Sequence, residues 1–246
     1  MPNVDFWDKL TVHCYKIGFA SLLLFLLPHP GQAQLFRWAR QHNTSYDNQK
    51  ITYGFSIGLH TSSYQVKYSN RFVSPKLDSV TQVQPIFSPG FSLGFLANYR
   101  ISDFFDFRIM PKAGFYVHKL NYYFTNRPMQ SQTVETTLLE FPLLIKYKSV
   151  RRGNVRMYMI GGITPAFEAS GKNDIGNSVA GLSIQKHNLS LDAGMGFDFY
   201  FPLFKLSQEI RFSRGISNML GSQYTVYQAP LSRLNTNTIS VYWIFQ

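Results

Sequence analysis

Serine and histidine side chains that lie close together can hydrolyse esters, and the sequence contains one such grouping. Ser62 and Ser63 follow His60 closely along the chain. His118 and His187 are two further histidines that could act as a base. A serine that a histidine activates, and that an acid helps to orient, could cleave a lipid. The alternative, which we favour, is that these residues line a rim and hydrogen-bond to neighbouring loops.

The sequence has no other pattern that is typical of an active site. We find no metal-ligand spacing, no glycine-rich loop that could hold a phosphate and no nucleophile elbow. A basic motif helix and an aromatic stacking platform for nucleic acid are also missing. We therefore expect a protein that is not an enzyme, with no catalytic residue, no metal, no cofactor and no nucleic-acid partner.

The elements that must position these side chains are predicted β-strands. From Lys50 onward, apolar residues alternate with small or polar residues, which is the two-residue period of a strand. In the first segment, for example, Ile51, Tyr53 and Phe55 are separated by smaller residues. The alternating segments are residues 51–60, 91–101, 105–118, 139–147, 155–168, 188–201, 204–213 and 238–246.

The connections between these segments alternate in length. Three are short, at 102–103, 149–154 and Pro202. The long connections are 61–87, 119–134, 169–186 and 214–235. Short turns on one side and long loops on the other, between strands of about ten residues, are typical of outer-membrane barrels. Residues 50–246 are therefore predicted to form an all-β domain, an eight-stranded antiparallel transmembrane outer-membrane β-barrel with short periplasmic turns and long extracellular loops.

Composition excludes two other classes of protein. The chain has 246 residues, of which 45% are hydrophobic, 16% aromatic and only 15% charged. A chain with so much apolar surface to bury is not disordered. The main apolar run, residues 17–27, is too short for a membrane-spanning helix, which needs about 20 residues.

Residues 1–33 are predicted to be a signal peptide. Two lysines precede the apolar run and small residues follow it, so we expect cleavage between Ala33 and Gln34. The alternative is a short buried helix. Residues 34–49 would form a periplasmic lead-in. The only cysteine, Cys14, would leave with the signal, which fits a bacterial envelope protein better than an exported eukaryotic one.

Alternation alone does not say which face of the barrel meets water, because a soluble barrel is apolar inside and a membrane barrel is polar inside. The polar face is rich in small residues, which fit the narrow lumen of eight strands. Aromatic residues gather at strand ends, as in interfacial girdles, at Tyr53, Tyr99, Tyr122, Tyr123, Tyr147 and Trp243. The polar face also carries charges that could pair inside a lumen, namely Arg100, Arg108, Lys112, Glu140, Lys146, Arg156, Glu168, Asp192, Asp198, Glu209 and Arg211. These features favour a membrane barrel.

The predicted long loops are strongly basic, and their only acidic residues are Asp78 and Asp174. Their basic residues are Lys67, Arg71, Lys76, Lys119, Arg127, Lys172, Lys186, Arg214 and Arg233. Outer-membrane lipid, and its anionic lipopolysaccharide in particular, is the partner that such loops would meet. An equally acceptable interpretation is that the loops are simply solvated.

The segment 139–148, LEFPLLIKYK, resembles a strand of small outer-membrane barrels from Bacteroidetes-type bacteria. Within that group, segments 209–220 and 231–240 are similar to the PorT family. The resemblance implies a component of the type IX secretion system that is also linked to gliding motility, with other secretion-system proteins as partners. It supplies no catalytic residues. The chain departs from many barrels in ending with Gln246 after the aromatic Phe245.

We therefore expect a non-enzymatic outer-membrane barrel that supports type IX secretion. Because an eight-stranded lumen is too narrow for folded cargo, the barrel would act as an assembly or partner subunit. One alternative is a general surface barrel for adhesion or envelope stability. The other alternative is a lipid-modifying enzyme that uses His60 or His118.

Overall fold

The computed structural model describes residues 46–47, 49–70, 72, 80–169, 184–221 and 227–246, which all belong to one compact unit, His42–Gln246. The predicted signal peptide, its cleavage site at Ala33 and Gln34 and most of the predicted lead-in lie outside the described residues. The same is true of Arg71, Lys76 and Lys172. No helix within the described ranges is long and apolar enough to cross a membrane.

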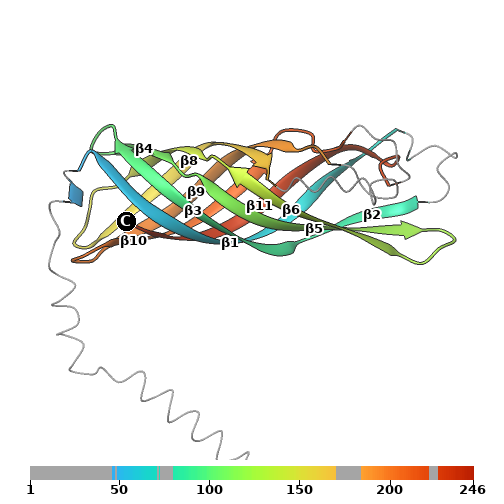
Figure 1. Ribbon diagram of the computed structural model, residues 1–246, viewed down its shortest axis with the longest axis horizontal. Helices are drawn as coiled ribbons and strands as arrows, with labels where there is room; N and C mark the ends of the chain where they lie inside the picture. The colour runs from blue at the N-terminus through green and yellow to red at the C-terminus, as the bar shows by residue number, and fades with distance from the viewer. Residues whose placement is uncertain (1–45, 48, 71, 73–79, 170–183, 222–226) are drawn as a thin grey trace, which may run out of the picture. The chain divides into compact units, whose positions relative to one another are not determined.

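The described strands form a closed antiparallel ring (Figure 1). They are β1 (Ile51–Tyr68), β2 (Val80–Ile86), β3 (Ser88–Arg100), β4 (Phe105–Ile109), β5 (Lys112–Phe124), β6 (Gln130–Glu140), β7 (Leu143–Lys148), β8 (Val155–Glu168), β9 (His187–Tyr200), β10 (Lys205–Gly215) and β11 (Leu231–Phe245). β2 and β3, β4 and β5, and β6 and β7 each follow one path along the wall, so the ring has eight strand positions. The predicted eight-stranded antiparallel barrel is confirmed.

The ring closes between its first and last strands. β1 pairs with β3 on one side and with β11 on the other, so Phe55 lies opposite both Phe95 and Phe245. β11 pairs with β10 on its other side, and β10 pairs with β9. Closure removes the free sheet edges that would otherwise expose unpaired backbone groups.

Prolines interrupt two of the strand paths. Pro111 lies between β4 and β5, and Pro142 lies between β6 and β7. The carbonyl of Pro111 accepts from Phe95 N over 2.9 Å, and that of Pro142 accepts from Met110 N over 3.1 Å. Neither proline can donate in return, because it has no N–H. The prediction of single strands over 105–118 and 139–147 is corrected for this reason.

Several strands run farther than the alternation predicts. β1 continues to Tyr68, β5 to Phe124 and β10 to Gly215, and β2 lies inside the predicted loop 61–87. The predicted loop bounds are wrong because outward-facing residues such as Gln65 are polar here, so apolar alternation stops while the hydrogen-bonded ladder continues. We call this end of the barrel the long-loop end. The short-turn end has the connections 101–104, 149–154 and 201–204 and the C-terminus (Figure 1).

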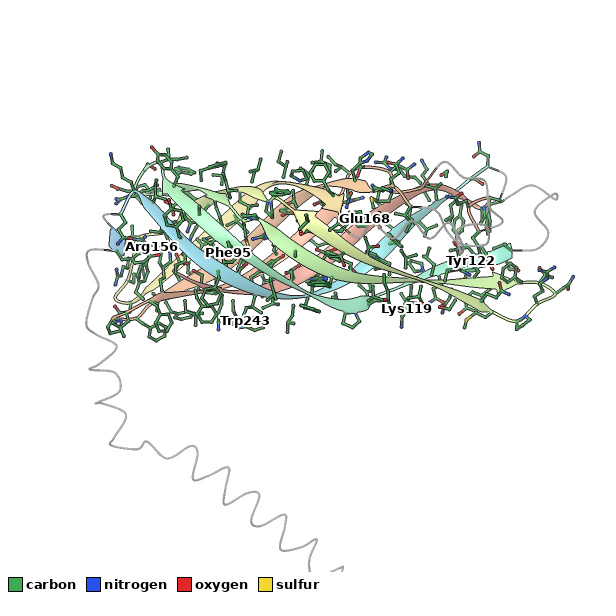
Figure 2. The ribbon with its side chains drawn as sticks, in the orientation of Figure 1. Phe95, Lys119, Tyr122, Arg156, Glu168 and Trp243 are labelled. Atoms are coloured by element: carbon green, nitrogen blue, oxygen red, sulfur yellow. The ribbon has the colours of Figure 1, made fainter. Side chains whose placement is uncertain are left out.

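Apolar side chains face outward and polar side chains face the lumen. Phe95 is 73% exposed on the outer wall, whereas Arg108 is 0% exposed inside the barrel. Figure 2 shows the layer of side chains on the outside of the wall, with Phe95 and Trp243 among those labelled. A soluble barrel has the opposite arrangement, so this wall is built to contact lipid.

One predicted girdle residue lies elsewhere. Tyr53, Tyr99 and Tyr147 are exposed on the outer wall, but Tyr122 is completely buried. Tyr122 belongs to an apolar cluster, which we call the apolar plug, that fills the lumen at the long-loop end. Its buried members are Tyr64, Val80, Val83, Leu120, Tyr122, Met219, Leu231 and Leu234. Strand parity explains the difference, because Tyr122 shares the inward parity of Leu120.

Candidate functional site

The centre of the lumen is a buried ion network around Glu209 on β10. Arg108 donates from Nη1 to Glu209 Oε2 over 2.8 Å, and the Tyr158 hydroxyl donates to the same oxygen over 2.9 Å. Arg211 donates to the other carboxylate oxygen, from Nε over 3.0 Å and also from Nη2. Arg108 also donates from Nε to Asn98 Oδ1 over 2.7 Å. Residues of four strands, β3, β4, β8 and β10, are thus joined by one network.

Two further ion pairs lie between this centre and the short-turn end. Lys146 Nζ is 2.6 Å from Asp198 Oδ2, and the Ser207 hydroxyl donates to the other oxygen of Asp198 over 2.5 Å. Lys148 Nζ is 2.5 Å from Asp106 Oδ1. The side chains of both pairs are buried, so each ion needs its partner to offset the loss of hydration.

A third buried pair lies toward the long-loop end. Lys112 Nζ is 2.5 Å from Glu140 Oε2, and the Tyr116 hydroxyl donates to Glu140 Oε1 over 2.6 Å. Asp192 lies nearby on β9, with Oδ2 3.7 Å from Arg211 Nη1. Asp192 lines the same small cavity as Lys112 and Glu140. Through its contact with Arg211, it links this third pair to the Glu209 network.

The short-turn end of the lumen is covered by Asp47, which precedes β1. Arg151 donates from Nη1 to Asp47 Oδ2 over 3.0 Å, and Arg156 donates from Nη1 to Asp47 Oδ1 over 3.2 Å. The guanidinium of Arg151 also lies 3.8 Å from the centre of the Tyr200 ring. Stacking on a ring and pairing with a carboxylate are both typical of arginine.

Lys205 lies just inside this covered end. Its Nζ is 4.8 Å from the centre of the Tyr46 ring and 6.0 Å from that of Tyr200, which are distances of cation–π contacts. Burial raises the pKa of Tyr46 to about 12, so its hydroxyl stays neutral at physiological pH. A cavity of about 30 Å³ lies here, and another of about 30 Å³ lies beside Glu140. Each has room for only a few water molecules.

Four of the histidine and serine candidates, His60, Ser62, Ser63 and His118, lie inside the barrel. The rings of His118 and Tyr64 stack with their centres 4.2 Å apart, and Ser62 Oγ lies 3.5 Å from His118 Nδ1. His60 is buried as well. The expected rim position is therefore wrong for His60 and His118, because β1 and β5 extend beyond them. His187 is exposed at the long-loop end, where β9 begins.

The charges predicted in the lumen fall into two groups. Arg100 and Arg156 lie at the short-turn end, where they contact Asp103 and Asp47 respectively, and Glu168 ends β8 at the opposite end (Figure 2). The others are buried along the lumen, namely Arg108, Lys112, Glu140, Lys146, Asp192, Asp198, Glu209 and Arg211.

Sequence reasoning missed several members of this arrangement. Asp106 and Lys148 share the strand parity of Arg108 and Lys146, so extending the alternation by one step would have included them. Asp47 gave no such signal, because it precedes the alternating segments and meets its arginines only in the folded barrel.

Most of the described basic residues that we expected in loops belong to strands. Arg127 lies in the turn between β5 and β6, and Lys186 immediately precedes β9. The strand residues are Lys67 in β1, Lys119 in β5, Arg214 in β10 and Arg233 in β11. All four are exposed, and the loop prediction is wrong for them because the strands continue beyond the apolar part of the wall.

The family model for the outer membrane protein beta-barrel domain matches residues 32–221 of the chain. Neisserial surface protein A is 13% identical, with a TM-score of 0.42, over 80% of this chain and 98% of that chain. OprG from Pseudomonas aeruginosa is 12% identical, with a TM-score of 0.43, over 78% and 92%. Ail of Yersinia pestis is 13% identical, with a TM-score of 0.33, over 80% and 98%. No curated protein sequence matches the chain.

The closed ring, the apolar outer wall and the family match lead to one conclusion. The barrel is an outer-membrane protein, whose short-turn end faces the periplasm and whose long-loop end faces the exterior. The chain belongs to the family of the outer membrane protein beta-barrel domain.

Proposed function

We propose that this barrel is a non-enzymatic, non-conducting outer-membrane protein that acts through its two ends and its outer surface. The observation that carries this proposal is the filled lumen. Asp47 with Arg151 and Arg156, which we call the Asp47 cluster, lies in series with the Glu209 network and the apolar plug along its axis. An eight-stranded barrel that is filled by side chains offers no path for a solute.

The buried histidines give little support to hydrolysis of a lipid. A serine nucleophile needs access to its substrate, but Ser62 is 0% exposed and His118 is stacked on Tyr64. The carboxylate near these residues, Glu140, is already occupied by Lys112 and Tyr116. We therefore propose that Ser62 and His118 fill space and satisfy each other's polar atoms.

For the cellular role, we propose support of type IX protein secretion as a partner subunit. The support for this role is the resemblance of segments 209–220 and 231–240 to the PorT family. The test is a clean gene deletion followed by assay of proteins that carry the type IX C-terminal signal. We expect these proteins to accumulate in the periplasm and to reach the surface again on complementation.

Normal secretion in the deletion strain would reject the type IX role. A general surface barrel for adhesion or envelope stability is then the better description. The filled lumen supports that role as much as it supports a role in secretion. The same strain also tests the enzyme alternative. Altered outer-membrane lipid that wild-type barrel restores, and that a His118→Ala barrel does not, would contradict a non-enzymatic role.

A further inference from the structure

Three cations gather on the outer wall where β1, β10 and β11 lie side by side. Lys67, Arg214 and Arg233 are all exposed there, and we call them the outer cation cluster. β11 lies between the other two strands, so one outward face carries all three side chains. Lys67 lies directly opposite Arg233, with their Cα atoms paired across the β1–β11 ladder.

The cluster lies beyond the apolar part of the wall. Arg214 follows that part directly, whereas Arg233 and Lys67 follow a stretch of polar outward residues. Along β11, the outward residues pass from Val241 and Ile239 through Asn237 and Asn235 to Arg233. On the other two strands the same progression holds. Leu59 on β1 precedes polar residues that lead to Lys67, and Phe212 on β10 is the outward neighbour of Arg214. This level is that of the extracellular lipid headgroups, because the apolar belt ends here.

The arrangement is unfavourable for the barrel alone. Lys67 and Arg233 lie directly opposite each other on neighbouring strands. Like charges in this arrangement destabilise a sheet. The only acidic residue of β1, β10 and β11 is Glu209, which is buried in the lumen. The outer faces of these three strands therefore offer no carboxylate to compensate the cluster.

Neighbouring polar groups hold the cluster in place. Arg214 reaches across β11 and donates from Nη2 to Gln65 Oε1 on β1 over 3.3 Å. Arg233 donates from Nη2 to the carbonyl of Ile216, and Asn235 donates to the carbonyl of Gly215 over 2.7 Å. These contacts use one edge of each guanidinium. Both arginines are exposed on the outer wall, and a guanidinium is a planar donor that suits a phosphate.

We propose that the outer cation cluster binds the phosphate of a phosphorylated glycolipid in the outer leaflet of the membrane. Three positive charges, which form no ion pair with a described carboxylate, recognise the phosphate. The apolar wall that begins next to Arg214, and that includes Phe212, Ile239 and Leu59, accepts the acyl chains of the same lipid. A free phosphate ion would use only the first of these two features. The proposal concerns a lipid site and does not depend on a role in secretion.

The test is equilibrium binding of fluorescently labelled diphosphorylated lipid A to the purified full barrel in neutral detergent micelles. The variant Lys67→Gln/Arg214→Gln/Arg233→Gln is expected to weaken binding by about 100-fold, on the scale of a basic group near an anionic lipid. The control variant Lys119→Gln/Arg127→Gln/Lys186→Gln removes the same charge from other parts of the same end. It is expected to change binding by less than about threefold.

Three results would overturn the proposal. Both triple variants could lose affinity equally, which means that only net charge matters. Dephosphorylated lipid A could bind the wild-type barrel as tightly as the diphosphorylated lipid. Inorganic phosphate could compete at the same concentration as the lipid, which would make the cluster a site for the free ion. If the triple variant fails to fold, the single variant Lys67→Gln must still weaken lipid binding by about fivefold.

Discussion

Glu209 lies at the centre of the buried ion network in the lumen. Its carboxylate receives hydrogen bonds from Arg108, Arg211 and Tyr158, and its side chain is 0% exposed. Removing water from a carboxylate and two guanidinium groups is costly, and only their mutual pairing offsets that cost. A change that removes the carboxylate therefore leaves two buried positive charges facing each other.

Glu209→Gln is expected to lower the free energy of unfolding by about 3–5 kcal/mol, because one partner of a buried ion network is lost while the others stay. Urea unfolding of the barrel in detergent or lipid, followed by the mobility shift between folded and unfolded forms on gels, measures this change. The control is Glu135→Gln on the exposed face of β6, which should leave stability within about 0.5 kcal/mol. Equal effects of the two substitutions would contradict a central role for Glu209.

At the scale of the strands, the sequence predicts the wall better than its ends. Apolar alternation locates all eight strand positions and their outward faces, because lipid contact demands an apolar residue at every second position. Beyond the lipid this demand disappears, so the extension of β1 to Tyr68 and the whole of β2 have no comparable signal. The contacts inside the lumen are even harder to predict from the sequence. Arg108 and Glu209 are 101 residues apart, and only the closed ring brings them together.

Three prolines lie at one level on neighbouring strands. The carbonyls of Pro111, Pro142 and Pro165 accept from Phe95 N, Met110 N and Phe141 N. Each of these antiparallel pairs would normally exchange two hydrogen bonds, and each keeps only one, because proline has no N–H. A hollow of about 590 Å³ on the outer wall borders this level, and its lining includes Phe95, Pro111 and Phe141.

Pro142→Ala is expected to slow amide hydrogen exchange of Met110 about twofold to tenfold, because the new N–H can complete the hydrogen-bonded pair. The measurement is exchange of assigned amides by NMR in micelles. Pro85→Ala in β2 is the matched control, since Pro85 pairs with Leu120 outside this level. Exchange at Met110 that is unchanged in Pro142→Ala, or slowed to the same extent in Pro85→Ala, would show that the missing donor does not weaken the wall locally.

At the scale of the whole molecule, the lumen is filled by successive layers of different chemistry. Polar pairs fill the barrel from Asp47 to Glu140, and the apolar plug follows at the extracellular end. The polar layers hold the walls together through ions that lie on different strands. The apolar plug instead uses the hydrophobic effect, which is available where the strands extend into water. Both kinds of filling exclude solutes.

The layers in series predict that loss of one layer leaves the barrel closed. The variant Tyr122→Ala/Leu234→Ala opens space in the apolar plug, but the Glu209 network and the Asp47 cluster still fill the lumen below it. We expect neither wild-type barrel nor this variant to give stepwise ion conductance in planar lipid bilayers. Steps in the wild type would reject a non-conducting barrel. Steps in the variant alone would show that the apolar plug is the only barrier and that water and ions pass the charged layers.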